Sequence, residues 1–126
     1  MRPAEPLSRQ TLADLQAIAT PGTLLTRPED CWAYGYDNSR RQALPQAVVL
    51  VEDVAQIQPL VALCNREGLP LVTRGRGTGT TGATVPDRGG LVLSCERLER
   101  ILDIDPDNRL AIVEPGVTNQ ALQQAL

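Results

Sequence analysis

The apolar positions near the N-terminus recur at the spacing of a helix. Within residues 8–19, Leu12, Leu15 and Ile18 fall on one helical face, and Ser8 is placed to accept a hydrogen bond from the first turn. The pattern therefore predicts an amphipathic helix. Residues 24–45 show no clear period, so we expect an extended, loop-rich segment. Its aromatic residues could pack on the domain or on a missing neighbour, and for Trp32 we expect packing on the domain.

From residue 47 the pattern predicts a strand, a helix and a second strand. Residues 47–51 form a continuous apolar run, typical of a buried strand, and residues 53–67 have helical spacing with a capping box from Asp53 and Gln56. Pro59 predicts a kink or a late start of that helix. Residues 71–73 form the second strand, which should run parallel to the first through a right-handed crossover.

Three shorter strands and a last helix follow. The strands are expected at residues 91–94, 101–105 and 110–114, with a hairpin turn at 106–109 and a helix over 119–126 capped by Thr118. The fold class is thus α/β (α+β), a small mixed sheet with flanking helices. We expect residues 1–44 to form an N-terminal helix and extended segment, and residues 45–126 a first α/β subdomain. Its last helix still has an apolar face at the final residue, which predicts truncation there.

A glycine-rich loop follows the second strand of the unit. Residues 73–84 read TRGRGTGTTGAT, with four glycines in eight positions. Glycine adopts positive φ without strain and lets successive backbone N–H groups point into one concavity, where an anion binds. The carboxyl end of a parallel strand is also where α/β sheets bind ligands. The loop therefore predicts a phosphate or pyrophosphate site, against the alternative of an unliganded surface loop.

Two familiar nucleotide motifs are excluded. Gly77, Gly79 and Gly82 match G-x-G-x-x-G, but that motif must open a helix, and Pro86 and then Gly89–Gly90 prevent one. A Walker loop needs a lysine, and the chain has none.

Composition narrows the chemistry further. Among 126 residues there is no Phe, one Trp and two Tyr, so the core must be aliphatic. A net charge of −3 without long runs of like charge argues against nucleic acid as a partner. The absence of histidine removes the commonest general base and metal ligand. Three widely spaced cysteines predict neither a disulfide framework nor a zinc site. No apolar run is long enough to span a membrane, and we expect a cytoplasmic protein.

The order of these motifs resembles a known family. In the order of its motifs, the chain is similar to the N-terminal part of the FAD-binding domain of the vanillyl-alcohol oxidase type. These motifs are the strand, the helix, and then LPLVTRGRGTGTTGATVP, GGLVL, ILDID and IVEPGVTN. Within that superfamily the chain most resembles the FAD subunit of glycolate oxidase and the FAD-linked D-lactate and D-2-hydroxyacid dehydrogenases. The match covers about residues 24–126.

The resemblance implies which residues hold the cofactor. The FAD pyrophosphate would be wrapped by the loop residues Arg74, Gly75, Arg76, Gly77, Thr78, Gly79, Thr81, Gly82, Ala83 and Thr84. Pro115, Gly116 and Val117 would approach the adenine or ribose, although they could equally be only a turn before a helix. Thr78 stands where some relatives tether the flavin through histidine, which implies non-covalent FAD. Family loops often carry a smaller residue at Arg76.

The resemblance also implies an activity for a longer parent. A small 2-hydroxy acid of the glycolate or D-lactate type would pass a hydride to FAD, with catalytic and substrate-binding residues beyond Leu126, so we expect this piece alone to be inactive. It offers no catalytic residue and no metal site. Other subunits of an oxidase complex are expected partners, and any membrane association would run through them. The alternatives are a related enzyme acting on a sugar, alcohol or phenol, and a non-catalytic nucleotide-binding or interaction module.

Overall fold

The structure, a computed structural model, describes residues 5–126 as a mixed α/β fold. The elements in chain order are α1 (Arg9–Ile18), β1 (Leu24–Leu25), α2 (Pro28–Cys31), the 3₁₀ turn η1 (Trp32–Tyr34), β2 (Ala47–Leu50), the 3₁₀ turn η2 (Val54–Gln56), α3 (Ile57–Glu67), β3 (Leu71–Arg74), β4 (Leu91–Ser94), β5 (Ile101–Asp105), β6 (Leu110–Val113) and α4 (Asn119–Ala125). The predicted class is confirmed.

The main sheet has the strand order β1-β2-β4-β3. The central strand β4 pairs in parallel with both neighbours, so that Val92 lies opposite Val48 on one side and Val72 on the other. The predicted parallel relation of β2 and β3 is therefore confirmed, with β4 inserted between them. Strands β5 and β6 form a separate antiparallel hairpin, as the turn at 106–109 predicts.

Alternate residues of the sheet enter two aliphatic cores. Val49 and Leu93 pack under α1 and α3, whereas Val48 and Val92 pack on the opposite face against Cys31. Strands covered on both faces need continuous apolar runs, which is why β2 and β4 are buried at every position. Leu15 of α1 belongs to the first core, so the N-terminal helix shares a core with the residues after position 45.

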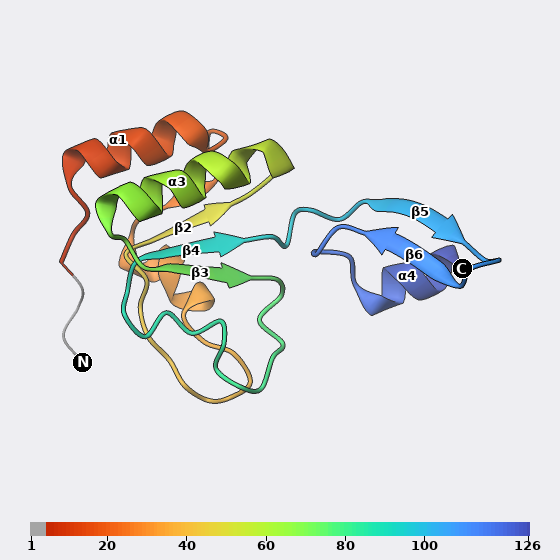
Figure 1. The fold of residues 1–126 in the computed structure, drawn as a ribbon. Helices are drawn as coiled ribbons and strands as arrows, with labels where there is room; N and C mark the ends of the chain where they lie inside the picture. Colours follow the sequence, from red (N-terminus) through yellow and green to blue (C-terminus); the bar gives the residue numbers. More distant parts are fainter. Residues whose placement is uncertain (1–4) are drawn as a thin grey trace.

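The predicted helix ends are confirmed in detail. Ser8 caps α1 by accepting from the backbone N–H of Thr11, and Asp53 and Gln56 form the capping box. Helix α3 begins only at Ile57, after the 3₁₀ turn η2, and Pro59 lies in its first turn, so the late start predicted from the proline is observed. Helices α1 and α3 lie side by side on one face of the sheet (Figure 1). None of the helices within residues 5–126 has the length and apolar content needed to cross a membrane.

The segment over residues 24–45 is more ordered than its sequence indicates. It contains the short strand β1, paired with β2, followed by α2 and η1. The expectation that Trp32 packs on the domain is wrong, because Trp32 is 55% exposed. Cys31 and Tyr34 lie one helical turn apart and face the second core, which directs the intervening Trp32 outward.

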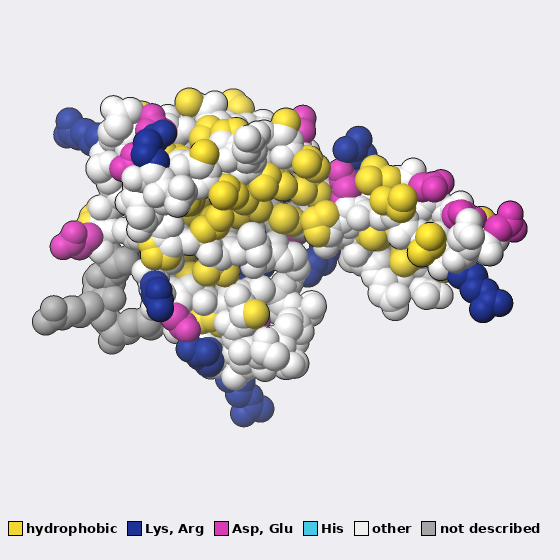
Figure 2. All heavy atoms as spheres, viewed as in Figure 1, with side chains coloured by type: hydrophobic (Ala, Val, Ile, Leu, Met, Phe, Trp, Pro, Cys, Tyr) yellow, Lys and Arg dark blue, Asp and Glu magenta, His cyan; other side chains and the backbone are white. Residues whose placement is uncertain are grey.

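The β5–β6 hairpin and α4 form a second unit beyond the carboxyl ends of the sheet strands (Figure 1). All four residues of β6 are exposed, including Leu110 and Ile112. Apolar side chains are visible on the surface of this unit in Figure 2. The glycine loop and the turn before α4 both lie where the two units meet.

Candidate functional site

A cleft of about 510 Å³ lies between the glycine loop and the turn that precedes α4. It begins directly after Arg74, the last residue of β3, at the carboxyl edge of the parallel strands, as predicted. Its lining residues are Gly75, Arg76, Gly77, Thr78, Gly79, Thr84, Pro115, Val117, Thr118 and Asn119. The volume falls in the range of small-molecule and cofactor sites.

The cleft brings together eight of the thirteen predicted site residues from two distant segments. The five that do not line it are Arg74, Thr81, Gly82, Ala83 and Gly116. Sequence reasoning missed Thr118 and Asn119, which line the cleft. Thr118 was recognised only as a helix cap, and it does accept from the N–H of Ala121. Their position directly after the Pro115–Val117 turn was the signal that could have found them.

The cleft wall presents hydrogen-bond donors without protein partners. In residues 5–126, the backbone N–H groups of Gly77, Thr78 and Gly79 donate to no protein acceptor. Over the same range, Thr84 Oγ1 is the single buried side-chain oxygen or nitrogen that lacks a hydrogen-bond partner. Buried polar groups are almost always paired, so an orphan hydroxyl beside free amides indicates a ligand with acceptor oxygens.

Arg74 does not line the cleft and instead contacts other groups of the protein. Its guanidinium donates to the carbonyls of Tyr36 (2.6 Å) and Ala33 (3.4 Å) and lies 5.8 Å from the ring centre of Tyr34. Gly77 has a φ of +68°, and a Cβ there would overlap this guanidinium. The glycine is therefore required by the buried arginine as well as by the turn.

A buried carboxylate holds the far half of the loop. Asp37 Oδ2 accepts from the N–H of Gly82 (3.0 Å), and its Oδ1 accepts from the N–H of Ser39 (2.8 Å). Hydrogen bonding by the Ser39 side chain, followed by the backbone N–H groups of Ser39 and Gly82, holds the pKa of Asp37 below its ordinary value. Asn38 adds a backbone bond to Gly79 O. Asp37 lies 45 residues from Gly82, so no local pattern reveals this support.

The Pro115–Val117 turn is fitted closely to the first unit. A Cβ on Gly116 would lie 2.5–2.7 Å from the carbonyl oxygens of Cys95, Leu98 and Glu96, a distance that only glycine avoids. The Gly116 N–H donates to Leu98 O. The turn is thus at once a helix lead-in and one wall of the cleft.

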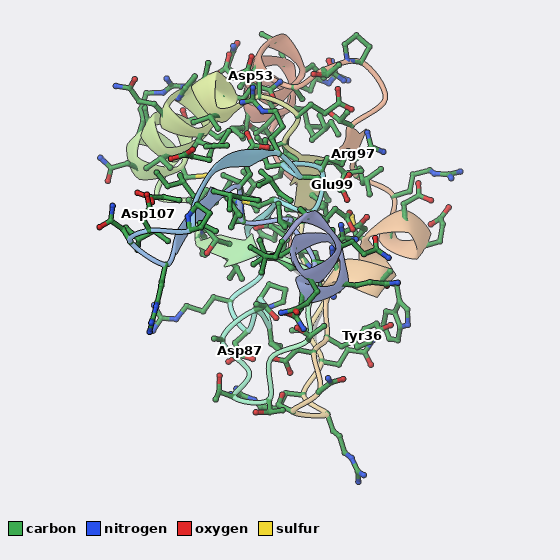
Figure 3. The ribbon with its side chains drawn as sticks, turned by 90° about the vertical axis from the view of Figure 1, so that its right-hand side faces the viewer. Tyr36, Asp53, Asp87, Arg97, Glu99 and Asp107 are labelled. Atoms are coloured by element: carbon green, nitrogen blue, oxygen red, sulfur yellow. The ribbon has the colours of Figure 1, made fainter. Side chains whose placement is uncertain are left out.

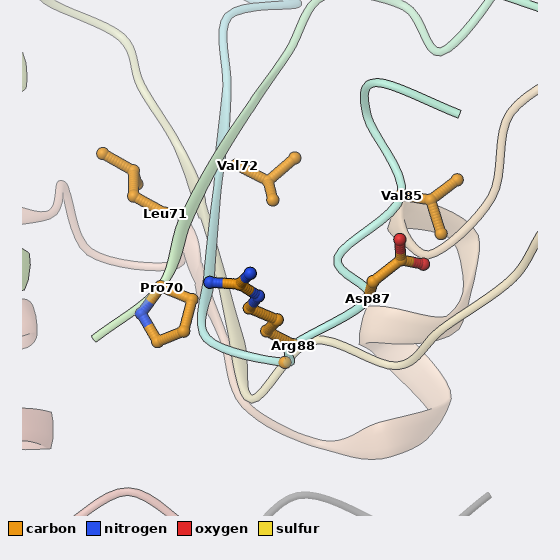
Figure 4. Close-up of a pocket in the computed structure, with 7 residues that line it drawn as sticks. Pro70, Leu71, Val72, Val85, Asp87 and Arg88 are labelled. Atoms are coloured by element: carbon orange, nitrogen blue, oxygen red, sulfur yellow. The ribbon is translucent and has the colours of Figure 1, made fainter. Parts of the chain in front are cut away.

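A second hollow lies at the opposite edge of the sheet. It measures about 340 Å³ and is bordered by Pro70, Val72, Val85, Asp87 and Arg88, among others (Figure 4). Its Asp87 is paired with Arg41 at 2.5 Å. Arg88 brings a guanidinium to this hollow, but no buried side-chain oxygen or nitrogen without a partner faces it within the described residues. Free backbone amides together with an unpaired buried hydroxyl are found in the first cleft.

The described residues offer binding groups and no activated nucleophile or base. Burial raises the pKa of Cys31 to about 11, and burial with a bond to Glu96 raises that of Tyr34 to about 12, so both stay protonated at neutral pH. Residues 5–126 contain no cluster of three metal-ligating side chains. What the arrangement can do chemically is hold an anionic group.

Comparison with known proteins identifies the family of this fold. Residues 45–126 match the family model described as "FAD binding domain". The glycolate oxidase subunit GlcD of Escherichia coli (strain K12) is 39% identical over 104 residues, which are 82% of this chain and 21% of that protein. The D-2-hydroxyglutarate dehydrogenase of Stutzerimonas stutzeri is 33% identical over 112 residues, 88% of this chain and 24% of that protein. The chain thus spans less than a quarter of the length of these relatives.

Solved structures agree on the fold. Substrate-bound p-cresol methylhydroxylase superposes with a TM-score of 0.81 at 26% identity, over 98% of this chain and 25% of that one. Alkyldihydroxyacetonephosphate synthase superposes with a TM-score of 0.82 at 18% identity, over 100% of this chain and 28% of that one. At this identity the likeness shows the fold alone. The donor set of the cleft suits the phosphate oxygens of FAD, since it combines free amides with an unpaired hydroxyl. The chain belongs to the FAD-binding domain family of vanillyl-alcohol-oxidase-type oxidoreductases.

Proposed function

We propose that this chain binds FAD non-covalently, with the pyrophosphate in the cleft between the glycine loop and the Pro115–Val117 turn. The observation that carries the proposal is the orphan Thr84 hydroxyl beside the free amides of Gly77, Thr78 and Gly79. Bonds from such donors to a charged phosphate contribute roughly 1.5–3 kcal/mol each. The sequence contains no histidine for a covalent link.

The remaining predicted residues take supporting roles in this proposal. Arg74 and Gly82 shape the loop through Ala33, Tyr36 and Asp37, and they do so without lining the cleft. Thr81 and Ala83 belong to the same stretch of loop. The pyrophosphate grip is therefore assigned to backbone amides and hydroxyls, while the guanidinium of Arg74 stabilises the segment behind them.

We further propose that the protein to which this chain belongs oxidises a 2-hydroxy acid of the glycolate or D-lactate type. Bound FAD would supply the two-electron redox chemistry that this oxidation needs. The residues described above bind and orient the cofactor. Support comes from the relatives, which include a glycolate oxidase subunit, a D-2-hydroxyglutarate dehydrogenase and a D-lactate dehydrogenase of Archaeoglobus fulgidus. Further oxidase subunits are the partners we propose.

A second candidate substrate class is a phenol, because the fold also superposes on p-cresol methylhydroxylase at 26% identity. Assaying the natural protein with glycolate, D-lactate and p-cresol, using an artificial electron-accepting dye, separates the two. Reduction of the dye by a hydroxy acid supports the first proposal. Reduction by p-cresol alone overturns it in favour of the second.

FAD binding itself is tested by titrating the purified chain with FAD and following the quenching of flavin fluorescence. We expect saturable binding, competed by ADP, which carries a pyrophosphate, and not by riboflavin, which has none. Equal competition by riboflavin would show that the pyrophosphate is not what the cleft grips. Absence of any saturable binding would overturn the assignment of the cleft in this chain.

A further inference from the structure

Arg76 reaches from the glycine loop to the opposite wall of the cleft. Its Nε and Nη2 donate to the carbonyl oxygen of Gly116, at 3.2 and 3.0 Å. Nη2 also donates to Glu96 O at 3.4 Å and forms an ion pair with the carboxylate of Glu99. One guanidinium therefore joins the loop, the connector between the units and the turn.

The connector carries two of these acceptors. Glu96 and Glu99 lie between β4 and β5, and Glu99 is labelled in Figure 3. The turn itself is fixed to this connector by the N–H of Gly116, which donates to Leu98 O at 2.8 Å. Arg76 adds the link from that assembly to the glycine loop.

We propose that Arg76 is a positioning residue that sets the width of the cofactor cleft. It does so by holding the carbonyl of Gly116, and with it Pro115 and Val117, at a fixed distance from the loop. A Cβ on Gly75 would lie 3.7 Å from Pro115 O. The two walls of the cleft therefore approach closely beside the Arg76–Gly116 contact. The identity of the ligand rests on the proposed function. The contacts of Arg76 that position the turn are present whether or not FAD binds.

Arginine is suited to this role by its geometry. The guanidinium is planar and offers five N–H groups in a fixed fork, so it can bind two carbonyls and a carboxylate at once. A lysine ammonium carries the same charge without that fork. The hairpin unit contributes no residue to the two buried cores, and its turn is held by the connector through Leu98 O and by the glycine loop through Arg76.

The test compares Arg76→Met, Arg76→Lys and Glu99→Gln in the flavin-free chain, with Arg66→Met as the matched control. Arg66 also links two elements, since it joins α3 to Asp14 of α1 at 2.8 Å, far from the cleft. Amide hydrogen exchange of Gly116 and Val117 should become about tenfold faster in Arg76→Met, with the amides of Val92 and Leu93 unchanged. The control should leave Gly116 and Val117 unchanged.

The other variants separate positioning from charge. Glu99→Gln keeps the bonds to Gly116 and should accelerate exchange there less than about threefold. Arg76→Lys should behave like Arg76→Met in both exchange and FAD affinity, which we expect to fall about tenfold. If Arg76→Met does not fold, Arg76→Lys provides the test in its place.

Two results would overturn the proposal. Unchanged exchange at Gly116 and Val117 in both Arg76 variants, together with weaker FAD binding, would make Arg76 a direct phosphate ligand. Full rescue by lysine would make its charge, and not its fork, the relevant property. Because exchange is measured without flavin, failure of the wild-type chain to bind FAD would contradict the proposed function and leave the exchange result to decide on Arg76.

Discussion

The two units of this molecule are stabilised in different ways. In the sheet unit, β2 and β4 are buried at every position, between helices on one face and the α2–η1 segment on the other. In the hairpin unit, β6 is exposed along its whole length, with Leu110 at 62% and Ile112 at 56%. The first has an aliphatic core, whereas the second is attached by a few polar and backbone contacts.

The difference shows where a binding site can be adjusted. Cores are close-packed and respond poorly to change, while surfaces joined by hydrogen bonds can be positioned by single residues. The cleft proposed to hold FAD lies where the two kinds of structure meet, with the glycine loop on the sheet unit and the Pro115–Val117 turn on the hairpin unit.

The largest expected effect is on the core of the sheet unit. Leu91 of β4 is fully buried, so Leu91→Ala should lower the free energy of unfolding by about 2–5 kcal/mol, measured by urea denaturation. Leu110→Ala is the matched change in the hairpin, and it should alter the same quantity by less than about 0.5 kcal/mol. Equal losses from the two variants would show that the hairpin has a core of its own.

Gly116→Ala should release the hairpin unit without unfolding the sheet. The new Cβ would lie within 2.7 Å of three carbonyl oxygens, and relieving such a clash costs about 1–3 kcal/mol. Hydrogen exchange should show lost protection in residues 110–117 and normal protection in β4. Gly79→Ala is the control, because a Cβ there meets no atom within 4 Å. Lost protection throughout β4 would contradict the separation of the units.

The stability of the hairpin unit should also depend on pH through Glu114, which pairs with Arg100 at the base of the hairpin. This carboxylate is buried and accepts from the side chain and the backbone N–H of Arg100, which together lower the pKa of Glu114. Because the folded pKa lies below the unfolded one, the contribution is complete at neutral pH and is lost as pH falls through the folded value.

Glu114→Gln should therefore flatten the decline of hairpin protection between about pH 7 and pH 3, measured by hydrogen exchange corrected for intrinsic rates. Glu29→Gln, an exposed carboxylate on α2, is the control and should leave the decline unchanged. An undiminished decline in Glu114→Gln would assign the acid sensitivity to other groups.

Most of the fold follows from local pattern. The continuous run over residues 47–51, the capping box of Asp53 and the turn at 106–109 predict elements that the structure contains. Strand β1 has only two residues, Leu24 and Leu25, and exists through its pairing with β2, so no period reveals it. The orientation of Trp32 depends on which neighbours face the second core, which is likewise a property of the tertiary structure.

The residue types of the candidate site were predictable from the sequence, but the directions of its side chains were less so. Glycines and a threonine after a parallel strand predict an anion site, and the structure places a cleft beside them, because backbone N–H groups line it. Side-chain directions depend on partners distant in sequence: Arg74 donates to Tyr36 O, and Arg76 to Gly116 O, 38 and 40 residues away. Motif order cannot specify such contacts.

The most direct test of the cleft as the FAD site is Thr84→Val, measured for both stability and FAD affinity. Valine has nearly the same shape and lacks the orphan hydroxyl, so the flavin-free chain should become more stable by about 1 kcal/mol, while FAD binding should weaken about tenfold. Thr80→Val, in the same loop but outside the cleft lining, should change the affinity little. Unchanged FAD affinity in Thr84→Val would contradict the account.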